Sequence, residues 1–401
     1  MEQPVLIIGA GVTGLTLAQA CQKKQIPFRI FERDDLSAHS QHRTVGKGLT
    51  EGFGLHHLKA ALPDELASCL PECYVDQAAV KFGEEGYYDV LNLTTAEPIK
   101  QKRTQKRVRL SREKLRTLLI TNIEVQWSKT LTQISADDDS VKATFSDGTS
   151  ETGSMLIGCD GANSTVNRIL HPEGHEDVGE TGRRLLLATA SYPASEVSAI
   201  RQIDPFFLHC EDFTTEVWLR VTFLDNPISE ASQPADAAVE KCQILISWPY
   251  QANWLGRVDP TDCPNTKIGQ MSLIRHLSDS WAEPFRSFIQ NMPRDADVQP
   301  VNLSDGFMAM SAGFAGRVTL AGQAAKPLST PFGDGAESSM EDVHGLSESF
   351  LDRFYGLAAD GGAGAGAGCG DGDGNRDFDF KAAREQYEGL LQELVLFEAL
   401  S

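Results

Sequence analysis

The sequence predicts an α/β fold with an inserted, mainly antiparallel β-sheet domain and a C-terminal helix. Three observations lead to this prediction. The first ~30 residues contain a strand, a helix and a second strand, which is the pattern of a βαβ unit. Two further strand–turn–helix patterns occur at residues 156–170 and 316–342. Between them, residues 180–300 contain alternating runs such as TEVWLRVTF and CQILISWPY, which indicate antiparallel strands.

The N-terminal unit begins with the apolar run PVLII, residues 4–8, which has the composition of a strand. Apolar residues then recur at helical spacing from about Val12 to Lys24. The segment FRIFER, residues 28–33, returns to a strand pattern. We therefore expect a strand, a helix and a strand in these three ranges.

The turn inside this unit reads GAGVTG, so that Gly9, Gly11 and Gly14 have GxGxxG spacing. Gly9 permits a tight turn, Gly11 leaves room for a pyrophosphate, and Gly14 permits close packing of the helix on the strand. Glu32 ends the second strand, where its carboxylate can accept the hydroxyls of a ribose. The alternative is a glycine-rich turn with a surface glutamate, but the order of strand, motif, helix and Glu32 favours a Rossmann-like nucleotide site.

The next part of the chain mixes helices and strands. We expect a helix from Leu55 to Leu70, a mixed β segment from Tyr74 to Arg109, and a helix with Ser111 as its N-cap. From Val125 to Ile157, strands alternate with the turns DDDS and SDGT, which predicts a β-meander.

A second motif, LIGCDGANSTVNRIL, occupies residues 156–170. An apolar strand leads to Asp160 and Gly161, and either Asn163 or Ser164 can cap the helix that follows. Taken by itself, this is a common strand-to-helix connection. Its position after the GxGxxG unit is what gives it significance.

A third motif lies in residues 316–342, GRVTLAGQAAKPLSTPFGDGAESSMED. Gly322 ends a strand, and Pro331, Gly333 and Gly335 precede a helix. The positive N-terminal end of that helix can face an anion.

Composition excludes several classes of protein. The 401 residues carry 36 basic and 56 acidic side chains, for a net charge of −20, so we expect no nucleic-acid partner. The eight cysteines lack the spacing of a metal site, and we expect none. We also expect no secretory signal and no membrane span, which favours a cytoplasmic protein. The pattern leaves the oligomeric state open.

Two segments complete the chain. Residues 358–377 are rich in Gly and Asp but lack the spaced ligands of a calcium loop, which favours a flexible linker. In the expected C-terminal helix, 378–401, Tyr387 belongs to an apolar face that docks on the body of the protein or on a partner.

The three motifs, taken in this order, resemble those of the FAD-dependent monooxygenases built like p-hydroxybenzoate hydroxylase. The segment RLSREKLRTLL resembles the part of that family that places an arginine near the flavin, here Arg112. The resemblance covers residues 1–170 and 300–355. Two stretches, QHRTVGKGLTEGFGLHHLKAALP and FSDGTSETGSMLIGCDGANSTVNRIL, are close to a branch common in fungal secondary metabolism. Between 180 and 300 only the general architecture is similar.

The resemblance implies an FAD site, with NAD(P)H as a co-substrate that has no nucleotide-binding domain of its own. The implied cofactor residues are Gly9, Gly11, Gly14, Glu32, Arg33, Arg112, Asp160, Gly161, Gly322, Gln323, Pro331, Gly333 and Gly335. The resemblance implies that Gly9, Gly11, Gly14 and Glu32 hold the ADP half, with Arg33 close to it. Asp160 lies on the pyrophosphate side, and Pro331, Gly333 and Gly335 line the isoalloxazine.

It also implies a division of the chain. The expected segments are FAD-binding parts at 1–72, 109–175 and 301–357, substrate-domain parts at 73–108 and 176–300, the linker at 358–377 and the helix at 378–401.

The implied reaction uses NAD(P)H and O2. A flavin C4a-hydroperoxide then hydroxylates or epoxidises a hydrophobic aromatic, polyketide, terpenoid or indole-type product. The site should be enclosed and apolar, because the hydroperoxide decays in water. Candidates to line it are Phe206, Phe207, His209, Trp218, Arg220 and Tyr250. No catalytic base is assigned. His209 and Tyr250 are candidates, although a structural hydrogen bond is the favoured role for a lone histidine near a strand.

One motif departs from the family. Where it has Gly-Asp-Ala-Ala-His, this chain has Gly322-Gln323-Ala324-Ala325-Lys326. A neutral amide at 323 makes a weaker hydrogen bond than a carboxylate. Lys326, Glu337 and Lys47 are also unusual near a flavin. These changes keep two alternatives open: a redox-silent member that catalyses a cyclisation or isomerisation, and a non-catalytic FAD-binding accessory protein.

Overall fold

The protein is described by a computed structural model over residues 3–36, 48–51, 54–75, 90–100, 108–172, 182–224, 239–301, 314–325, 335–355 and 387. The predicted linker at 358–377 lies outside these residues. So does the predicted C-terminal helix at 378–401, apart from Tyr387.

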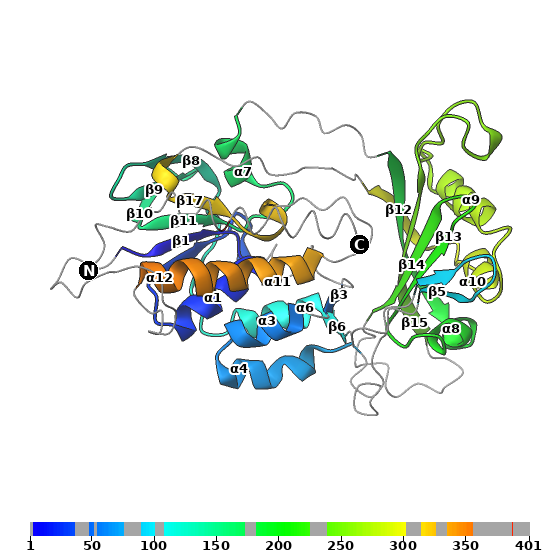
Figure 1. Ribbon diagram of the computed structural model, residues 1–401, viewed down its shortest axis with the longest axis horizontal. Helices are drawn as coiled ribbons and strands as arrows, with labels where there is room; N and C mark the ends of the chain where they lie inside the picture. Colours follow the sequence, from blue (N-terminus) through cyan, green and yellow to red (C-terminus); the bar gives the residue numbers. More distant parts are fainter. Residues whose placement is uncertain are drawn as a thin grey trace.

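A parallel sheet forms the centre of the N-terminal unit (Figure 1). Its strands, in spatial order, are β17 (Val318–Leu320), β11 (Met155–Gly158), β1 (Val5–Ile8), β2 (Phe28–Phe31) and β7 (Val125–Gln126). The chain runs from β1 to β2 on one side and places β11 on the other. The sheet therefore has a switch point at the carboxyl end of β1, where ligands bind in such sheets.

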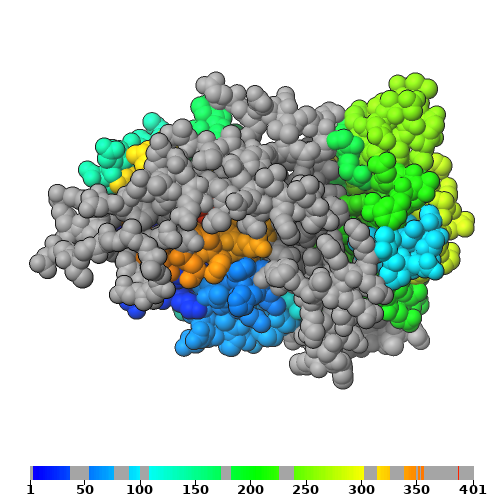
Figure 2. Space-filling view, viewed as in Figure 1, coloured from blue at the N-terminus to red at the C-terminus, as the bar shows by residue number. Residues whose placement is uncertain are grey.

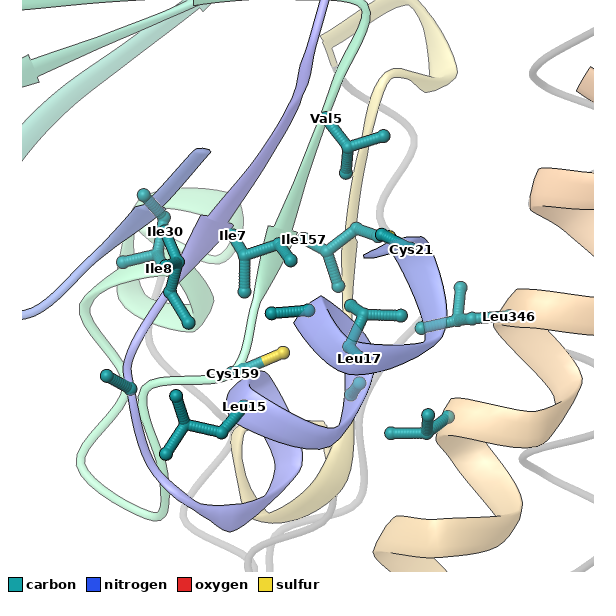
Figure 3. Packing of buried hydrophobic residues seen from close by; sticks show 14 of the residues in the cluster. Val5, Ile7, Ile8, Leu15, Leu17, Cys21, Ile30, Ile157, Cys159 and Leu346 are labelled. Carbon is teal, nitrogen blue, oxygen red and sulfur yellow. The ribbon is translucent and has the colours of Figure 1, made fainter. Parts of the chain in front are cut away.

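Helix α1 (Val12–Lys23) crosses from β1 to β2, as the helical spacing predicts. In Figure 3, α1 lies between the strands that carry Ile7 and Ile157 and the helix that carries Leu346. Leu15, Ile7 and Ile157 have no exposed surface, because both faces of the strands are covered. This explains why these strands are continuous apolar runs without alternation.

The prediction of one continuous helix from Leu55 to Leu70 is wrong. The chain forms α3 (Gly54–Ala61) and α4 (Asp64–Cys69), followed by the short helix η1 (Leu70–Cys73). Pro63 separates α3 from α4 with extended backbone angles, φ −53° and ψ 144°. Proline has no N–H to continue a helix, and it disfavours helical angles in the residue before it.

The two predicted N-caps are confirmed. The Ser111 hydroxyl accepts from the Lys114 N–H at 3.4 Å and begins α6 (Arg112–Leu119). Of the two candidates for the next cap, the structure uses Ser164, whose hydroxyl accepts from the Asn167 N–H at 2.9 Å and begins α7 (Thr165–Leu170).

The predicted meander from Val125 to Ile157 is correct only in its middle. Strands β8 (Leu131–Ala136), β9 (Val141–Phe145) and β10 (Ser150–Gly153) form an antiparallel sheet. The outer two, β7 and β11, belong to the parallel sheet. The difference follows from burial, because every residue of β11 is buried whereas β10 is largely exposed.

The second large unit is a seven-stranded sheet in which the pairs are antiparallel except for β13 with β4. Its order is β16 (Asp297–Val301), β12 (Arg183–Pro193), β15 (Val239–Pro249), β14 (Val217–Phe223), β13 (Phe207–Asp212), β4 (Val90–Asn92) and β5 (Pro98–Lys100). Figure 2 shows the cyan residues of β4 and β5 beside the green residues of this unit. The predicted α/β fold with an antiparallel sheet is confirmed.

Helices α8 (Ala194–Arg201), α9 (Lys267–Leu277) and α10 (Phe285–Gln290) pack on this sheet and were not predicted. The core between them and the sheet includes Tyr192, which stacks on Phe288 at 4.7 Å and donates its hydroxyl to the Phe288 carbonyl at 3.1 Å. Short turns make up other parts of the chain: η4 (Trp254–Gly256), η5 (Phe314–Gly316) and η6 (Gly322–Ala324).

Helix α11 (Gly335–Gly345) continues through a π-helical turn, Leu346–Leu351, into α12 (Asp352–Phe354). Tyr387 packs against this part of the fold. Tyr387 is buried, and its hydroxyl donates to the Leu320 carbonyl at 3.1 Å. Its ring lies so near Gly345 that a Cβ atom added there would be 3.6 Å from it. The apolar face of the C-terminal helix was expected to dock either on the body of the protein or on a partner. Tyr387, which belongs to that face, docks on the body of the protein. In the described residues, no helix is long and apolar enough to span a membrane.

Candidate cofactor pocket

The glycines of the GxGxxG motif meet the geometric demands predicted for them. Gly9 has φ +106°, and a Cβ on it would lie 2.6 Å from the Cys159 carbonyl oxygen. A Cβ on Gly14 would lie 2.0 Å from the Gly9 carbonyl oxygen, so the helix approaches the turn more closely than any side chain permits. Gly11 differs, because a Cβ there would meet nothing within 4 Å. Its open side faces a pocket.

This pocket has a volume of about 450 Å³ and lies at the switch point of the parallel sheet. Its lining comes from all three sequence motifs, although they are far apart along the chain. Among the lining residues are Gly9, Gly11, Thr13, Glu32, Arg33, Asp34, Arg112, Arg116, Asp160, Gly161, Gln323 and Ser339.

Glu32 is held at the end of β2, facing the turn. Its carboxylate accepts from the Ala10 N–H at 2.7 Å and from the Asp34 N–H at 3.1 Å, and the residue is only 7% exposed. The two backbone donors fix the carboxylate in the pocket lining. The pocket therefore has a carboxylate at the position where the sequence predicts a ribose acceptor.

Arg116 is a charged, buried pocket residue that the sequence prediction missed. It is 9% exposed, and its Nε and Nη2 atoms have no hydrogen-bond partner among the described residues. Burial, and then the charge of Arg112, lowers the pKa of Arg116 to about 10, so the side chain is still a cation at neutral pH. A buried cation with open donors fits an anion such as a phosphate. Its spacing of four from Arg112, which places both on one helix face, was the available signal.

The side chain of Asp160 hydrogen-bonds to the N-terminal end of the helix that follows it, α7. Its carboxylate accepts from the Ser164 hydroxyl and from the Thr165 N–H, the latter at 2.6 Å. Arg33 donates to its backbone carbonyl at 3.4 Å. Gly161 follows with φ +79° and open space at its Cβ position. The DG motif thus caps α7 and leaves the backbone after Asp160 accessible from the pocket.

The third motif reaches the same pocket through Gln323, which is exposed. Gly322 has φ +63°, and a Cβ on it would lie 2.7 Å from Thr13 Oγ1. The N–H of Gly322 donates to the buried carboxylate of Asp342 on α11 at 2.8 Å. The turn that presents Gln323 is therefore hydrogen-bonded to α11 and passes close to Thr13 of α1.

The rest of this motif is only partly described. Gly335 is the first residue of α11. Pro331 and Gly333 lie outside the described residues, as do Lys47 and Lys326.

The predicted substrate-lining residues lie in strands of the seven-stranded sheet or directly next to them, and none of them lines the cofactor pocket. His209 is 3% exposed and its ring contacts Trp218 edge-on at 5.0 Å. Arg220 is the direct partner of His209 in the neighbouring strand. Tyr250 is half-buried, with the Arg184 guanidinium 3.4 Å from its ring centre. Phe206 and Phe207 are buried beside them in sequence.

The pocket residues fit FAD. The open face of Gly11 accommodates a phosphate at the N-terminus of α1, and the two unpartnered nitrogens of Arg116 supply the matching donors. The fixed carboxylate of Glu32 completes the donor and acceptor set that a dinucleotide requires.

Comparison with known proteins agrees with this geometry. Residues 2–209 match the FAD binding domain family. A probable FAD-dependent monooxygenase of Arthroderma benhamiae is 35% identical over 86% of this chain and 81% of its own length. An FAD-dependent monooxygenase of Aspergillus terreus is 33% identical over 84% of this chain and 87% of its own length. The chain therefore belongs to the family of FAD-dependent monooxygenases.

Solved structures show the same fold. A putative FAD-containing monooxygenase from Photorhabdus luminescens has a TM-score of 0.68 at 21% identity and covers 99% of this chain and 96% of its own. The 2,6-dihydroxypyridine-3-hydroxylase from Arthrobacter nicotinovorans has a TM-score of 0.64 at 16% identity, covering 98% and 88%.

Proposed function

We propose that the chain binds FAD in the pocket at the switch point and uses NAD(P)H and O2 to oxygenate a hydrophobic small molecule in a secondary-metabolite pathway. The observation that carries the proposal is the convergence of Gly11, Glu32 and Arg116 on one pocket. In this arrangement Glu32 takes the ribose, and Arg116 with Arg112 takes the phosphates. Gln323, in the third motif, meets the remaining polar part of the cofactor. When bound, FAD supplies the transfer of one oxygen atom from O2 to the substrate.

The residues of this chain contribute orientation and exclusion of water. Phe207, Trp218 and His209 are buried in the seven-stranded sheet, and a substrate site beside these largely apolar side chains suits a hydroxylation or epoxidation of an aromatic, polyketide, terpenoid or indole-type compound. The proposed setting is the cytoplasm, since the described cysteines are free thiols.

We also propose the division into three nucleotide-binding and two substrate segments. Strands of the parallel sheet come from 1–72, 109–175 and 301–357. The seven-stranded sheet takes β4 and β5 from 73–108 and its other strands from 176–300, with β16 extending to Val301.

The purified protein tests the proposal by its absorption spectrum. Flavin bands, present as isolated or after reconstitution with FAD, support it. A colourless protein that cannot be reconstituted would overturn it in favour of redox-silent chemistry. Oxidation of NADH or NADPH that rises when aromatic compounds are added separates a monooxygenase from an accessory protein that only holds FAD.

A further inference from the structure

The turn that presents Gln323 is held at both of its ends by side chains from helices. At its start, the N–H of Gly322 donates to the Asp342 carboxylate on α11 at 2.8 Å. At its end, the Ala324 carbonyl accepts from Nδ2 of Asn167 on α7, also at 2.8 Å. Gly322 and Ala324 are buried, whereas Gln323 between them is exposed and lines the cofactor pocket. The two bonds therefore fix the backbone on each side of the residue that reaches the pocket.

The side chain of Asn167 is buried, and the turn is what fixes its amide. The residue is 5% exposed. Among the described residues, its Oδ1 atom has no hydrogen-bond partner, so the bond to the Ala324 carbonyl sets the orientation of the side chain. Ala324 is buried as well, and a buried carbonyl that loses its donor is costly. Without the Asn167 amide, the end of the turn would therefore move toward another donor.

This bond joins the second sequence motif to the third. The Asp160 carboxylate accepts from the Thr165 N–H at 2.6 Å and so fixes the start of α7. Asp160, Gly161 and Thr165 all line the cofactor pocket. Asn167 lies two residues after Thr165 on the same helix and carries the connection to a turn that is 157 residues away along the chain. The position of Gln323 is thus coupled to the part of the pocket that the second motif forms.

Asn167 acts on the pocket only through the turn. It is not among the described residues that line the pocket, so its amide does not meet a ligand there. With the bond to Ala324 removed, the described bond of Gly322 to Asp342 still holds the start of the turn. The end of the turn could then pivot about that start, and the side chain of Gln323 would change its direction.

We propose that Asn167 is a positioning residue: through the Ala324 carbonyl, it holds Gln323 in the direction in which the Gln323 amide meets a polar group of FAD. This inference rests on the proposed function. Its consequence is that Asn167 and Gln323 contribute to FAD affinity as one unit. Substitutions at the two positions are therefore not additive, although the side chains belong to distant parts of the chain.

The test is a double-mutant cycle in which FAD affinity is measured by fluorescence titration. Asn167→Leu keeps the approximate size of the side chain and removes the donor, and Gln323→Ala removes the amide from the pocket. Each substitution alone should weaken FAD binding about threefold to tenfold. Asn167→Leu added to Gln323→Ala should weaken it by less than about twofold more. A residue that only stabilised the fold would weaken binding by the same factor with and without the Gln323 amide.

A matched control lies in the other unit of the protein. Gln270 on α9 is 6% exposed, its Nε2 donates to the Pro264 carbonyl at 2.9 Å, and its Oε1 has no partner among the described residues. Gln270→Met removes the same kind of bond and should leave FAD affinity unchanged. Thermal unfolding confirms that each variant is folded. Asn167→Asp, which sets a carboxylate against the Ala324 carbonyl, replaces Asn167→Leu in the cycle if the leucine variant does not fold.

A second measurement needs no cofactor. The Ala325 N–H donates to the Gly322 carbonyl at 2.9 Å and closes the turn. Hydrogen exchange over residues 321–325 of the FAD-free protein should be faster in Asn167→Leu and unchanged in Gln270→Met. Unchanged exchange in the folded Asn167 variants, or additive effects in the cycle, would overturn the inference and leave the proposed function intact. If the protein takes up no FAD, the proposed function fails, while exchange still decides whether Asn167 holds the turn.

Discussion

The backbone N–H of Gly322 donates to the buried carboxylate of Asp342 at 2.8 Å, which joins the turn after β17 to helix α11. The family pattern places an acid at the next residue, where this chain has Gln323. The acid on α11 therefore shapes the turn, while an amide is presented to the pocket. The shape of the turn and the charge of its exposed side chain are thus set by different residues.

This separation predicts the effect of Gln323→Asp. Because Asp342 holds the turn, the substitution should preserve its shape and supply a charged acceptor for a cofactor hydroxyl. A gain of roughly 1 to 2 kcal/mol corresponds to FAD binding that is about tenfold tighter. Fluorescence titration with FAD measures it, with Gln323→Glu as a control of equal charge and greater length. Loss of turnover in a variant that still binds FAD would instead assign a catalytic role to the amide.

Removal of the buried cation in the pocket should weaken FAD binding. Arg116→Met keeps much of the length of the side chain and removes the donors of Nε and Nη2. Hydrogen bonds to charged groups contribute about 1.5 to 3 kcal/mol, so the Kd should rise about tenfold to a hundredfold. Arg29→Met is the matched control, because Arg29 is on β2 in an exposed pair with Glu151. Equal affinity in both variants would remove Arg116 from the site.

The site residues that could be predicted from the sequence are those whose role depends on steric contacts within one short segment. Gly9 and Gly14 are required by contacts within one turn, so their spacing in the sequence is sufficient to find them. Arg116 gains its role only when α6 packs against α1 and brings this side chain to the pocket that Glu32 also lines, which is a contact between distant parts of the chain. Pro63 did carry a local signal, and the helical pattern on each side obscured it.

The same reasoning applies to the fold. The buried parallel strands are short apolar runs that can be recognised one at a time. The helices that cover the seven-stranded sheet, such as α9, have mixed patterns, because only one side faces the core: Ile274 is 1% exposed and Ile268 is 81% exposed. Which strand pairs with which is decided by packing over long distances, as in β11, whose apolar run lies in the parallel sheet rather than in the meander.

Two alanine substitutions in the GxGxxG turn should separate folding from binding. Gly14→Ala places a methyl group 2.0 Å from the Gly9 carbonyl oxygen, so it should destabilise the protein by about 1 to 3 kcal/mol. Gly11→Ala meets no atom within 4 Å and should leave stability nearly unchanged. The same methyl group projects into the pocket and should lower FAD affinity. Denaturant unfolding without FAD and titration with FAD measure the two effects. A Gly11→Ala protein with normal FAD affinity would place the phosphates elsewhere.

A histidine pair between α3 and α11 should make stability depend on pH. The rings of His57 and His344 lie 4.4 Å apart, with His56 adjacent. Burial, and then the charges of His344 and His56, lowers the pKa of His57 below its ordinary value of 6.5. As the pH falls through 6.5, His57 is protonated in the unfolded chain, whereas in the folded protein it stays neutral until a lower pH. Stability is therefore present above pH 6.5 and is lost as the pH falls toward the folded pKa.

The variant His57→Phe keeps an aromatic ring against His344 and removes the titrating group. It should lose less stability than the natural protein between about pH 7.5 and about pH 5.5, as followed by urea unfolding at each pH. His276→Phe is the control, because His276 is exposed and pairs with Asp279 at the surface of α9. It should keep the pH dependence of the natural protein. If His57→Phe instead lost as much stability on acidification as the natural protein, the acid sensitivity would arise from other groups.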